Sequence, residues 1–262
     1  MRHELEQGSE WILTENLEKS QARVLGQGLE EIDPNNDFGS YRLLNSGRGD
    51  SRIEAHNATG NSARCYAKSL RFQVRKLGIG HGTIADLGCG AGFIAAAVRQ
   101  EFPESAVSGY DIAAEAIGYA RKSFPEVTFH AAAIEPGMRL PERFDLIYAN
   151  EFYPFTRTDS LSFYLAYLDT LLAHVGGANG ALVVSMISQE KCLLLRLDEI
   201  RARYRDAYTI VKSLVPSAKI LSLFRNFALA QLATRMANIA FGRKNHFKVI
   251  FMKKECLERS NR

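Results

Sequence analysis

The sequence lacks the features that mark secreted, membrane-spanning or metal-binding chains. Its cysteines, Cys65, Cys89, Cys192 and Cys256, match neither a disulfide framework nor a metal-binding spacing, so no metal site is predicted. There is no run of about eighteen apolar residues, so no membrane-spanning helix is expected. The segment Met1–Glu6 is charged and has no apolar core, which argues against a signal peptide. We therefore expect reduced cysteines and a cytoplasmic location.

A strong excess of one charge sign is also missing. The formal net charge of the 262 residues is +4, which by itself does not indicate a nucleic-acid partner. Internal repeats and low-complexity tracts are absent, and 46% of the residues are hydrophobic, as in ordinary globular proteins. This length fits one large domain or one domain with an elaborated end.

The most informative stretch is a glycine-rich turn within residues 83–94. A short apolar strand leads into Gly88, Gly90 and Gly92, and a helix follows. Glycine is needed where the backbone takes a positive φ or comes close to a ligand, and a helix start offers free N–H groups. About twenty residues further on, Asp111 ends a second apolar strand. This layout is typical of a nucleoside site in a doubly wound α/β fold.

Strand and helix patterns alternate from Gly82 onward, which is typical of an α/β domain with right-handed crossovers. The uninterrupted apolar stretch 181–187 is expected at the middle of a parallel sheet. The predicted strands cover residues 82–88, 106–111, 127–131, 144–150, 181–187, 208–215 and 246–253. The predicted helices cover residues 91–101, 113–123, 160–175 and 189–205, and another begins near Asn61 or Ser62.

Two segments stand outside this alternation. Residues 1–61 combine a predicted helix with turn formers, and they form either a mobile segment or an ordered lid. Residues 219–241 are predicted as a helix with one apolar side, inside an insertion at about 217–243. That helix could pack on the core, cover a ligand pocket, form a dimer surface, or touch a membrane or polyanion. We therefore divide the chain into residues 1–61 and a main domain, 62–262.

The motifs of this main domain resemble those of the class I S-adenosylmethionine (SAM)-dependent methyltransferases. Residues 86–92 (DLGCGAG) are similar to that family's D-x-G-x-G-x-G turn, residues 110–112 to its acidic end of strand two, and residues 144–147 to its fourth strand. The turn fits SAM proteins better than NAD-binding domains. The resemblance implies a Rossmann-like, seven-stranded, mostly parallel sheet with helices on both faces. Its last strand, 246–253, would be antiparallel and inserted beside 208–215.

The resemblance also implies SAM as cofactor and S-adenosylhomocysteine (SAH) as product. Backbone amides of Gly88, Gly90 and Gly92 would approach the methionine part, and Asp86 would orient its amino group. Asp111 would bind both ribose hydroxyls, which a carboxylate does well. The acidic residue that the family often places at adenine is missing, so backbone groups near residues 133–134, or Glu135, would bind adenine. The other expected cofactor-binding residues are Cys89, Ile112, Ala133, Ile134, Asn150, Arg64 and Tyr41.

Candidate catalytic residues follow the third and fourth strands, because ligands of open α/β sheets bind at the carboxyl ends of strands. A hydroxyl or ammonium acceptor must lose a proton, and Glu151 is the best-placed carboxylate to take it. Alternatively, Glu151 caps a helix or pairs with Arg157. Tyr153 could orient the acceptor or contact the methyl sulfonium. His130 and His246 are further candidate bases, although a lone histidine is more often structural.

The predicted function is methyl transfer from SAM to an oxygen or nitrogen of a small-molecule acceptor, such as a sugar-type or secondary metabolite. A first alternative is an RNA or protein methyltransferase, in which Arg71, Lys76, Arg225 and Lys244 would share one face and binding would weaken steeply with salt. A second alternative is a SAM-binding protein without turnover. DNA is not an expected partner, because residues 150–153 (NEFY) only faintly resemble the N-P-P-Y signature of DNA amino-methyltransferases. A homodimer is left open.

Overall fold

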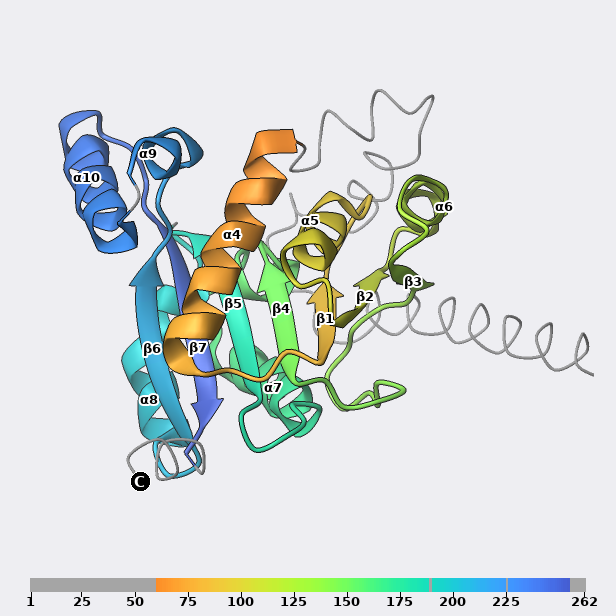
Figure 1. Ribbon diagram of the computed structural model, residues 1–262. Helices are drawn as coiled ribbons and strands as arrows, with labels where there is room; N and C mark the ends of the chain where they lie inside the picture. Colours follow the sequence, from red (N-terminus) through yellow and green to blue (C-terminus); the bar gives the residue numbers. More distant parts are fainter. Residues whose placement is uncertain (1–59, 189, 225, 255–262) are drawn as a thin grey trace, which may run out of the picture.

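The computed structural model describes residues 60–188, 190–224 and 226–254. The expected N-terminal helix and lid, with Tyr41, therefore lie outside the described residues. The described chain forms one seven-stranded sheet with helices on both faces (Figure 1). The strand order is β3-β2-β1-β4-β5-β7-β6.

The sheet is parallel from β3 to β5, and β7 runs antiparallel between β5 and β6. This arrangement confirms the predicted Rossmann-like sheet with its last strand inserted in the opposite direction. The strands are β1 Thr83–Leu87, β2 Ala106–Asp111, β3 Thr128–Ala131, β4 Leu146–Asn150, β5 Ala181–Ile187, β6 Tyr208–Leu214 and β7 His246–Lys253.

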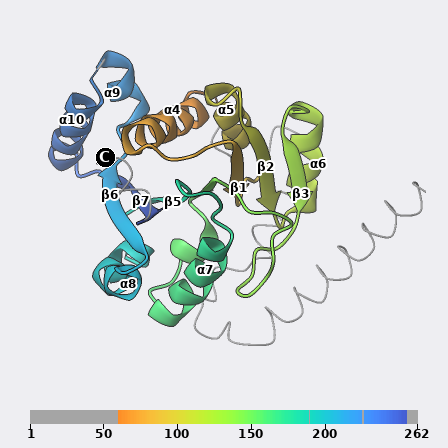
Figure 2. The same ribbon diagram turned by 60° about the horizontal axis from the view of Figure 1, so that its bottom comes forward.

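The helices divide between the two faces, as Figure 2 shows. One core cluster joins the sheet to α4, α5 and α6, and the other joins the opposite face to α7 and α8. The helices are α4 Gly60–Leu77, α5 Phe93–Glu101, α6 Ala114–Ser123, α7 Leu161–Ala173, α8 Leu197–Tyr204, α9 Ala218–Leu223 and α10 Phe227–Ala240. Two short 3-10 turns are η2 Tyr153–Phe155 and η3 Leu193–Arg196.

Two predicted helices are divided in the structure. The helix expected over 189–205 is present as η3 followed by α8, and the helix expected over 219–241 is present as α9 and α10. The side chain of Asn226 accepts hydrogen bonds from the N–H groups of Ala228 and Leu229 at the start of α10. Asparagine is a favoured N-cap because its side chain satisfies such N–H groups. It therefore starts a new helix here.

The carboxyl ends of the parallel strands form one edge of the sheet, at the top of Figure 1. The loops after β1, β2, β3 and β4 lie along this edge. Because β7 is antiparallel, it begins at the same edge, where His246 is paired with Ile187 at the end of β5. Chemical groups from six strands, β1 to β5 and β7, are therefore brought to one side of the molecule.

Candidate functional site

The glycine-rich turn after β1 has a backbone that only glycine tolerates easily. Gly88, Gly90 and Gly92 have φ values of 69°, 52° and 82°. A Cβ atom on Gly92 would lie 2.6 Å from Cζ of Phe129 and 2.9 Å from Cβ of Ala120. The positive φ and the close packing both exclude a side chain at this position. The turn is therefore fixed against α6 and β3.

Backbone hydrogen bonds connect this turn to the end of β2. The N–H groups of Gly88 and Cys89 donate to the carbonyl oxygen of Tyr110, with N···O distances of 2.8 and 3.1 Å. The Cys89 side chain is buried in the core, and burial raises the pKa of its thiol. Any contact of Cys89 with a ligand would therefore come from its backbone.

Asp111 connects the turn to the start of α6. Its Oδ2 accepts a hydrogen bond from the N–H of Gly90 at 2.7 Å, and its Oδ1 accepts one from the N–H of Ala113 at 2.9 Å. Burial raises the pKa of Asp111, and these two N–H groups act in the opposite direction. Each carboxylate oxygen has a second lone pair that can accept another hydrogen bond. The carboxylate therefore fits a neighbouring diol such as a ribose.

Asp86 is a buried acid without a partner for one oxygen. The residue is 2% exposed, and no described residue forms a hydrogen bond with its Oδ2. Burial, followed by the negative charge of Asp111, raises the pKa of Asp86 to about 8. A buried polar atom without a partner is costly, and an ammonium group of a ligand would satisfy it. Asp86 therefore fits the predicted contact with the amino group of SAM.

The residues expected around adenine lie beside the end of β2. The N–H of Ala132 donates to the carbonyl oxygen of Asp111 at 2.8 Å, which places the loop after β3 next to Ile112. Ile112 and Ala133 are half-buried, and Ile134 is buried in the core. Their contact with adenine stays a prediction.

Glu151 follows β4 in a strained backbone conformation. Its φ of 51° is the only positive value among the described non-glycine residues. Its N–H donates to the carbonyl oxygen of Ser185 at 2.8 Å, and its Oε1 accepts from the N–H of Ile187 at 2.7 Å. Burial raises the pKa of Glu151 to about 7. Such a value is suitable for a general base near neutral pH.

The rest of this loop lies against the glycine-rich turn. A Cβ atom on Gly88 would be 3.0 Å from Cδ2 of Phe152. Phe152 is also the N-cap residue of η2, so Glu151 does not occupy that position. The positive charge of Arg157 lowers the pKa of Glu151, but its effect is smaller than that of burial. Tyr153 is half-buried in η2.

Next to Glu151, the face of the sheet toward α4 carries polar groups that the sequence predictions mostly missed. Ser185 Oγ and His246 Nε2 are 2.8 Å apart, and His246 Nε2 lies 3.6 Å from Oε1 of Glu151. The rings of Tyr66 and His246 have centroids 5.1 Å apart. Burial, followed by the charge of Lys248, lowers the pKa of His246 to about 3, so this imidazole is neutral at pH 7.

Lys248 is the deepest member of this polar layer. Its side chain is fully buried, and its Nζ donates to the carbonyl oxygen of Tyr66 at 3.3 Å. Burial lowers the pKa of Lys248 to about 7. Asn150 also belongs to this layer, and its Oδ1 accepts a hydrogen bond from the hydroxyl of Tyr148 at 3.1 Å. The alternation of His246 and Lys248 in β7 was the available signal, because a period of two places them on one face.

The structure does not bring His130 to Glu151. β2 and β1 separate β3 from β4, which corresponds to about 14 Å at the usual strand spacing. The His130 ring stacks on Tyr110 with centroids 4.7 Å apart, and burial lowers its pKa. Arg64 is exposed on α4, and its predicted contact with the cofactor stays a prediction.

Two classes of feature are missing from the part of the chain that the structure describes. No group of three or more histidine, cysteine, aspartate or glutamate side chains there could hold a metal ion. None of the helices described is both long enough and apolar enough to cross a membrane.

Comparison with known proteins agrees with this geometry. Residues 84–176 match a family model described as a methyltransferase domain. The matched residues contain the glycine-rich turn, Asp111 and Glu151. Over these residues the chain is similar to a methyltransferase domain, in agreement with the resemblance of its motifs to class I SAM-dependent methyltransferases.

Curated proteins match this chain over only part of their length. Ribosomal RNA small subunit methyltransferase C of Actinobacillus pleuropneumoniae is 37% identical over 71 residues, covering 26% of this chain and 22% of that protein. Malonyl-[acyl-carrier protein] O-methyltransferase of Bacillus cereus is 38% identical over 69 residues, covering 26% and 25%. The chain thus spans about a quarter of the length of the curated relatives it matches.

A solved structure extends the likeness of the fold to most of the chain. The plantazolicin methyltransferase BpumL, in complex with a triazolic desmethylPZN analog and SAH, superposes with a TM-score of 0.55. The similarity covers 91% of this chain and 98% of that one at 14% identity. At this identity, the superposition shows a shared fold.

Proposed function

We propose that this protein transfers a methyl group from SAM to an oxygen or nitrogen of a small-molecule acceptor, such as a sugar-type or secondary metabolite. The observation that carries the proposal is the arrangement of three carboxyl groups at one sheet edge. Asp86 and Asp111 flank the glycine-rich turn, and Glu151 follows the adjacent strand β4. The BpumL structure, which shares this fold, holds SAH together with a triazolic desmethylPZN analog.

The first two carboxyl groups would hold the cofactor. Asp86 supplies the unpartnered buried oxygen for the amino group, and Asp111 supplies acceptor lone pairs for the ribose hydroxyls. When bound, SAM supplies an electrophilic methyl group on a sulfonium, so the protein contributes mainly alignment. The turn between β1 and α5 provides that alignment, because its backbone is hydrogen-bonded to β2.

Glu151 would take the acceptor's proton. Its Oε1 is held by the N–H of Ile187, and its pKa of about 7 allows it to accept a proton near neutral pH. The neutral His246 and the hydroxyl of Ser185 line the same edge and could orient a polar acceptor. Tyr153 is the next candidate for acceptor contact because it lies in η2, two residues beyond Glu151.

A small acceptor is favoured over RNA by the placement of the basic residues. Arg71 forms an ion pair with Glu101 of α5, with its Nη1 2.9 Å from Oε2. Lys76, in contrast, lines a groove toward α10, so these two side chains do not share a face. Arg225 lies outside the described residues. The raised pKa of Glu151 favours catalysis over a purely binding role, and a homodimer stays a prediction.

Calorimetric titration with SAH tests the cofactor site. We expect wild-type protein and Glu104→Gln, which alters an exposed carboxylate, to bind SAH, and Asp111→Ala to lose binding. Incubation with labelled SAM and fractionated metabolite pools then tests the acceptor class. Failure of the wild-type protein to bind SAH contradicts the whole proposal. Binding without methyl transfer to any pool contradicts the enzymatic part and supports a binding protein.

A further inference from the structure

Helix α10 has two opposite apolar faces. One face is buried, with Phe227, Ala230 and Thr234 at most 7% exposed. The other face forms an outer stripe that is open to solvent. At 100° per residue, the stripe spans an arc of about 80° that points away from the buried face. The outer stripe consists of Leu229 (52% exposed), Leu232 (58%), Met236 (60%) and Ile239 (68%).

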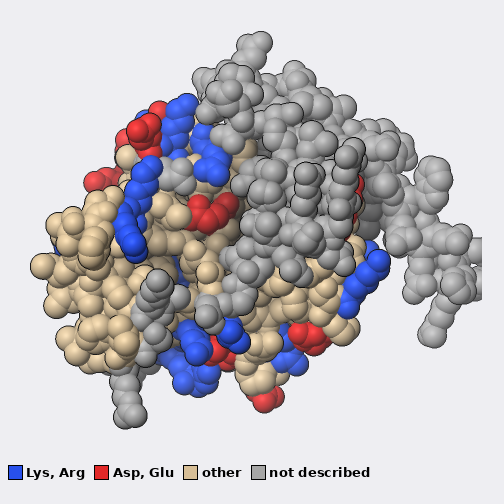
Figure 3. All heavy atoms as spheres, turned by 90° about the horizontal axis from the view of Figure 1, so that it is seen from above, with Lys and Arg blue, Asp and Glu red and all other residues tan. Residues whose placement is uncertain are grey.

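Neighbouring residues enlarge this apolar surface. Phe241, directly after α10, is 73% exposed, and Leu223, at the end of α9, is 78% exposed. Both helices form a corner of the molecule at the upper left of Figure 1. In Figure 3 the same corner is largely uncharged, with lysine or arginine side chains and some acidic side chains at its border. Exposed apolar surface of this extent marks an interaction site.

The segments around this corner are strongly and uniformly basic. Residues 207–254 contain nine lysine and arginine residues and no aspartate or glutamate. Residues 60–77, which form α4, contain five and again no acid. The remainder of the chain has nineteen basic and twenty-nine acidic residues. Lys248 is buried and Arg71 is paired with Glu101, but Lys76, Lys212, Arg235, Arg243 and Lys244 of these segments are exposed.

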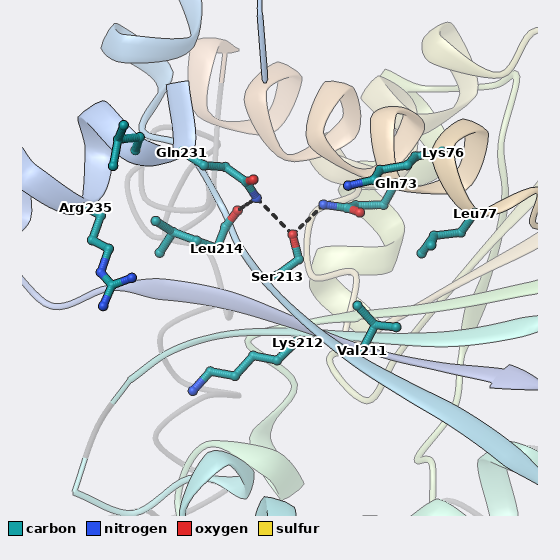
Figure 4. A pocket seen from close by; sticks show the side chains of 10 residues that line it. Gln73, Lys76, Leu77, Val211, Lys212, Ser213, Leu214, Gln231 and Arg235 are labelled. Carbon is teal, nitrogen blue, oxygen red and sulfur yellow. Dashed lines mark hydrogen bonds between the residues drawn. The ribbon is translucent and has the colours of Figure 1, made fainter. Parts of the chain in front are cut away.

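A groove lies between this corner and α4 (Figure 4). Its volume is about 360 Å³, and none of the ten residues that line it is acidic. Lys76 of α4 and Arg235 of α10 lie on opposite walls. Ser213 Oγ on the floor accepts hydrogen bonds from Nε2 of Gln73 at 2.5 Å and of Gln231 at 2.9 Å. The groove thus offers cations to an anionic group directly beside Leu232.

We propose that the α9–α10 corner docks the protein on the surface of an anionic lipid bilayer. The outer stripe would enter the interface between headgroups and acyl chains, and the surrounding cations would meet lipid phosphates, one of them in the groove. An amphipathic helix with apolar side chains toward lipid and basic residues at its margins binds such surfaces. The proposal concerns binding only and does not depend on methyl transfer.

Two other occupants explain the surface less well. A second copy of the chain would place the same patch on both sides of a two-fold interface, so the basic residues would face one another. RNA would be attracted by the charge, and single-stranded RNA stacks on aromatic rings, but the four side chains of the outer stripe are not aromatic and Phe241 lies beyond the end of α10. An anionic bilayer complements the charge and the aliphatic stripe together.

Vesicle flotation of the full chain tests the proposal. The probe is a vesicle of equimolar phosphatidylglycerol and phosphatidylcholine, compared with phosphatidylcholine alone. We expect at least about tenfold tighter binding to the anionic vesicles, and weaker binding at high salt. The double variant Leu232→Ser/Met236→Ser should lose about tenfold in affinity, because two apolar groups leave the interface. Leu195→Ser is the matched control, because Leu195 is 55% exposed in η3, far from α10 in the sequence.

Circular dichroism and SAH titration of each variant separate loss of docking from loss of folding. Equal binding to both vesicle types contradicts the proposal, as does an equal loss in Leu195→Ser. A dimer in sedimentation velocity that dissociates only in the double variant would assign the stripe to a second copy instead. RNA binding that the two serine substitutions leave unchanged, without vesicle binding, would assign the basic side to RNA.

Discussion

Replacing Asp86 with asparagine is expected to stabilise the ligand-free protein while weakening its affinity for SAH. The carboxyl group ionises near its ordinary pKa of 3.8 in the unfolded chain, but burial and the charge of Asp111 raise its pKa to about 8 in the folded protein. Its stabilising contribution is therefore complete below the unfolded value and is lost as the pH rises toward 8. At 1.36 kcal/mol per pKa unit, this loss reaches about 4 kcal/mol at pH 7.

Asparagine at position 86 removes this pH-dependent loss but leaves an amide without a partner. The neutral carboxyl group carries a similar unpaired group, so we expect a net gain of about 2–4 kcal/mol in the free energy of unfolding at pH 7. For a chain of this size, the gain corresponds to an increase in melting temperature of about 4–15 °C. The gain should be smaller at about pH 5 and larger at about pH 8.

Guanidinium unfolding of wild type and Asp86→Asn across this pH range measures the effect without ligand. Asp111→Asn is the contrasting variant, because both oxygens of Asp111 accept hydrogen bonds from backbone N–H groups. In Asp111→Asn the side-chain amide nitrogen would face a backbone N–H group, so we expect the free energy of unfolding to fall by about 1–3 kcal/mol. Equal or lower stability of folded Asp86→Asn at pH 7 would show that the buried Asp86 carboxyl group does not destabilise the protein.

The ligand provides a second measurement on the same residue. An ammonium group placed against Asp86 would lower its pKa, so SAH binding at pH 7 should release close to one proton from the wild-type protein. Calorimetry in buffers of different ionisation enthalpy detects this release. Asp86→Asn should bind SAH more weakly and release no proton.

Three further predictions concern the acceptor side, the buried lysine and the turn. Because burial raises the pKa of Glu151 to about 7, the rate of methyl transfer should increase as the pH rises through about 7. Glu151→Gln should lower kcat about 10²–10⁴-fold while SAH binding is retained. A flat pH–rate profile would contradict the role of Glu151 as the base. Burial lowers the pKa of Lys248 from 10.5 to about 7, so stability is lost as the pH falls from about 10 toward 7. Lys248→Met should therefore raise the melting temperature at pH 7, and no increase there would argue against a costly buried cation. Gly92→Ala places a Cβ 2.6 Å from Phe129 at φ 82° and should lower the free energy of unfolding by about 2–5 kcal/mol. Gly137→Ala, at φ 80° but with open space around its Cβ, should lower it by only about 1–2 kcal/mol. Equal losses of the two variants on chemical denaturation would contradict the packing argument.

The cofactor side of the candidate site could be located from the sequence because its signals are local. A turn with glycine at every second position and an acid at the next strand end are both visible within about thirty residues. The inserted strand 246–253 was expected from the family resemblance, and the structure confirms it. The division of residues 62–262 from the N-terminal segment stays a prediction.

The polar layer beside Glu151 could not be predicted from the same kind of pattern. In the sequence, Lys248 is a single charged residue in an apolar strand. Its hydrogen-bond acceptor, the carbonyl oxygen of Tyr66, is 182 residues away in the sequence. The break between α9 and α10 was missed because the apolar spacing continues across it. Only the N-cap hydrogen bonds of Asn226 mark the new helix.

Local sequence patterns are sufficient to predict the alternation of strands and helices, the glycine-rich turn and the two aspartates beside it. Those features depend on side-chain period and backbone preference over short distances, which a linear sequence records directly. The tertiary structure decided which groups became buried and which stayed open: it raised the pKa of Glu151, buried Lys248 and left one apolar face of α10 in solvent. Burial arises from elements that are distant in the chain, so only the assembled sheet and its covering helices could determine it.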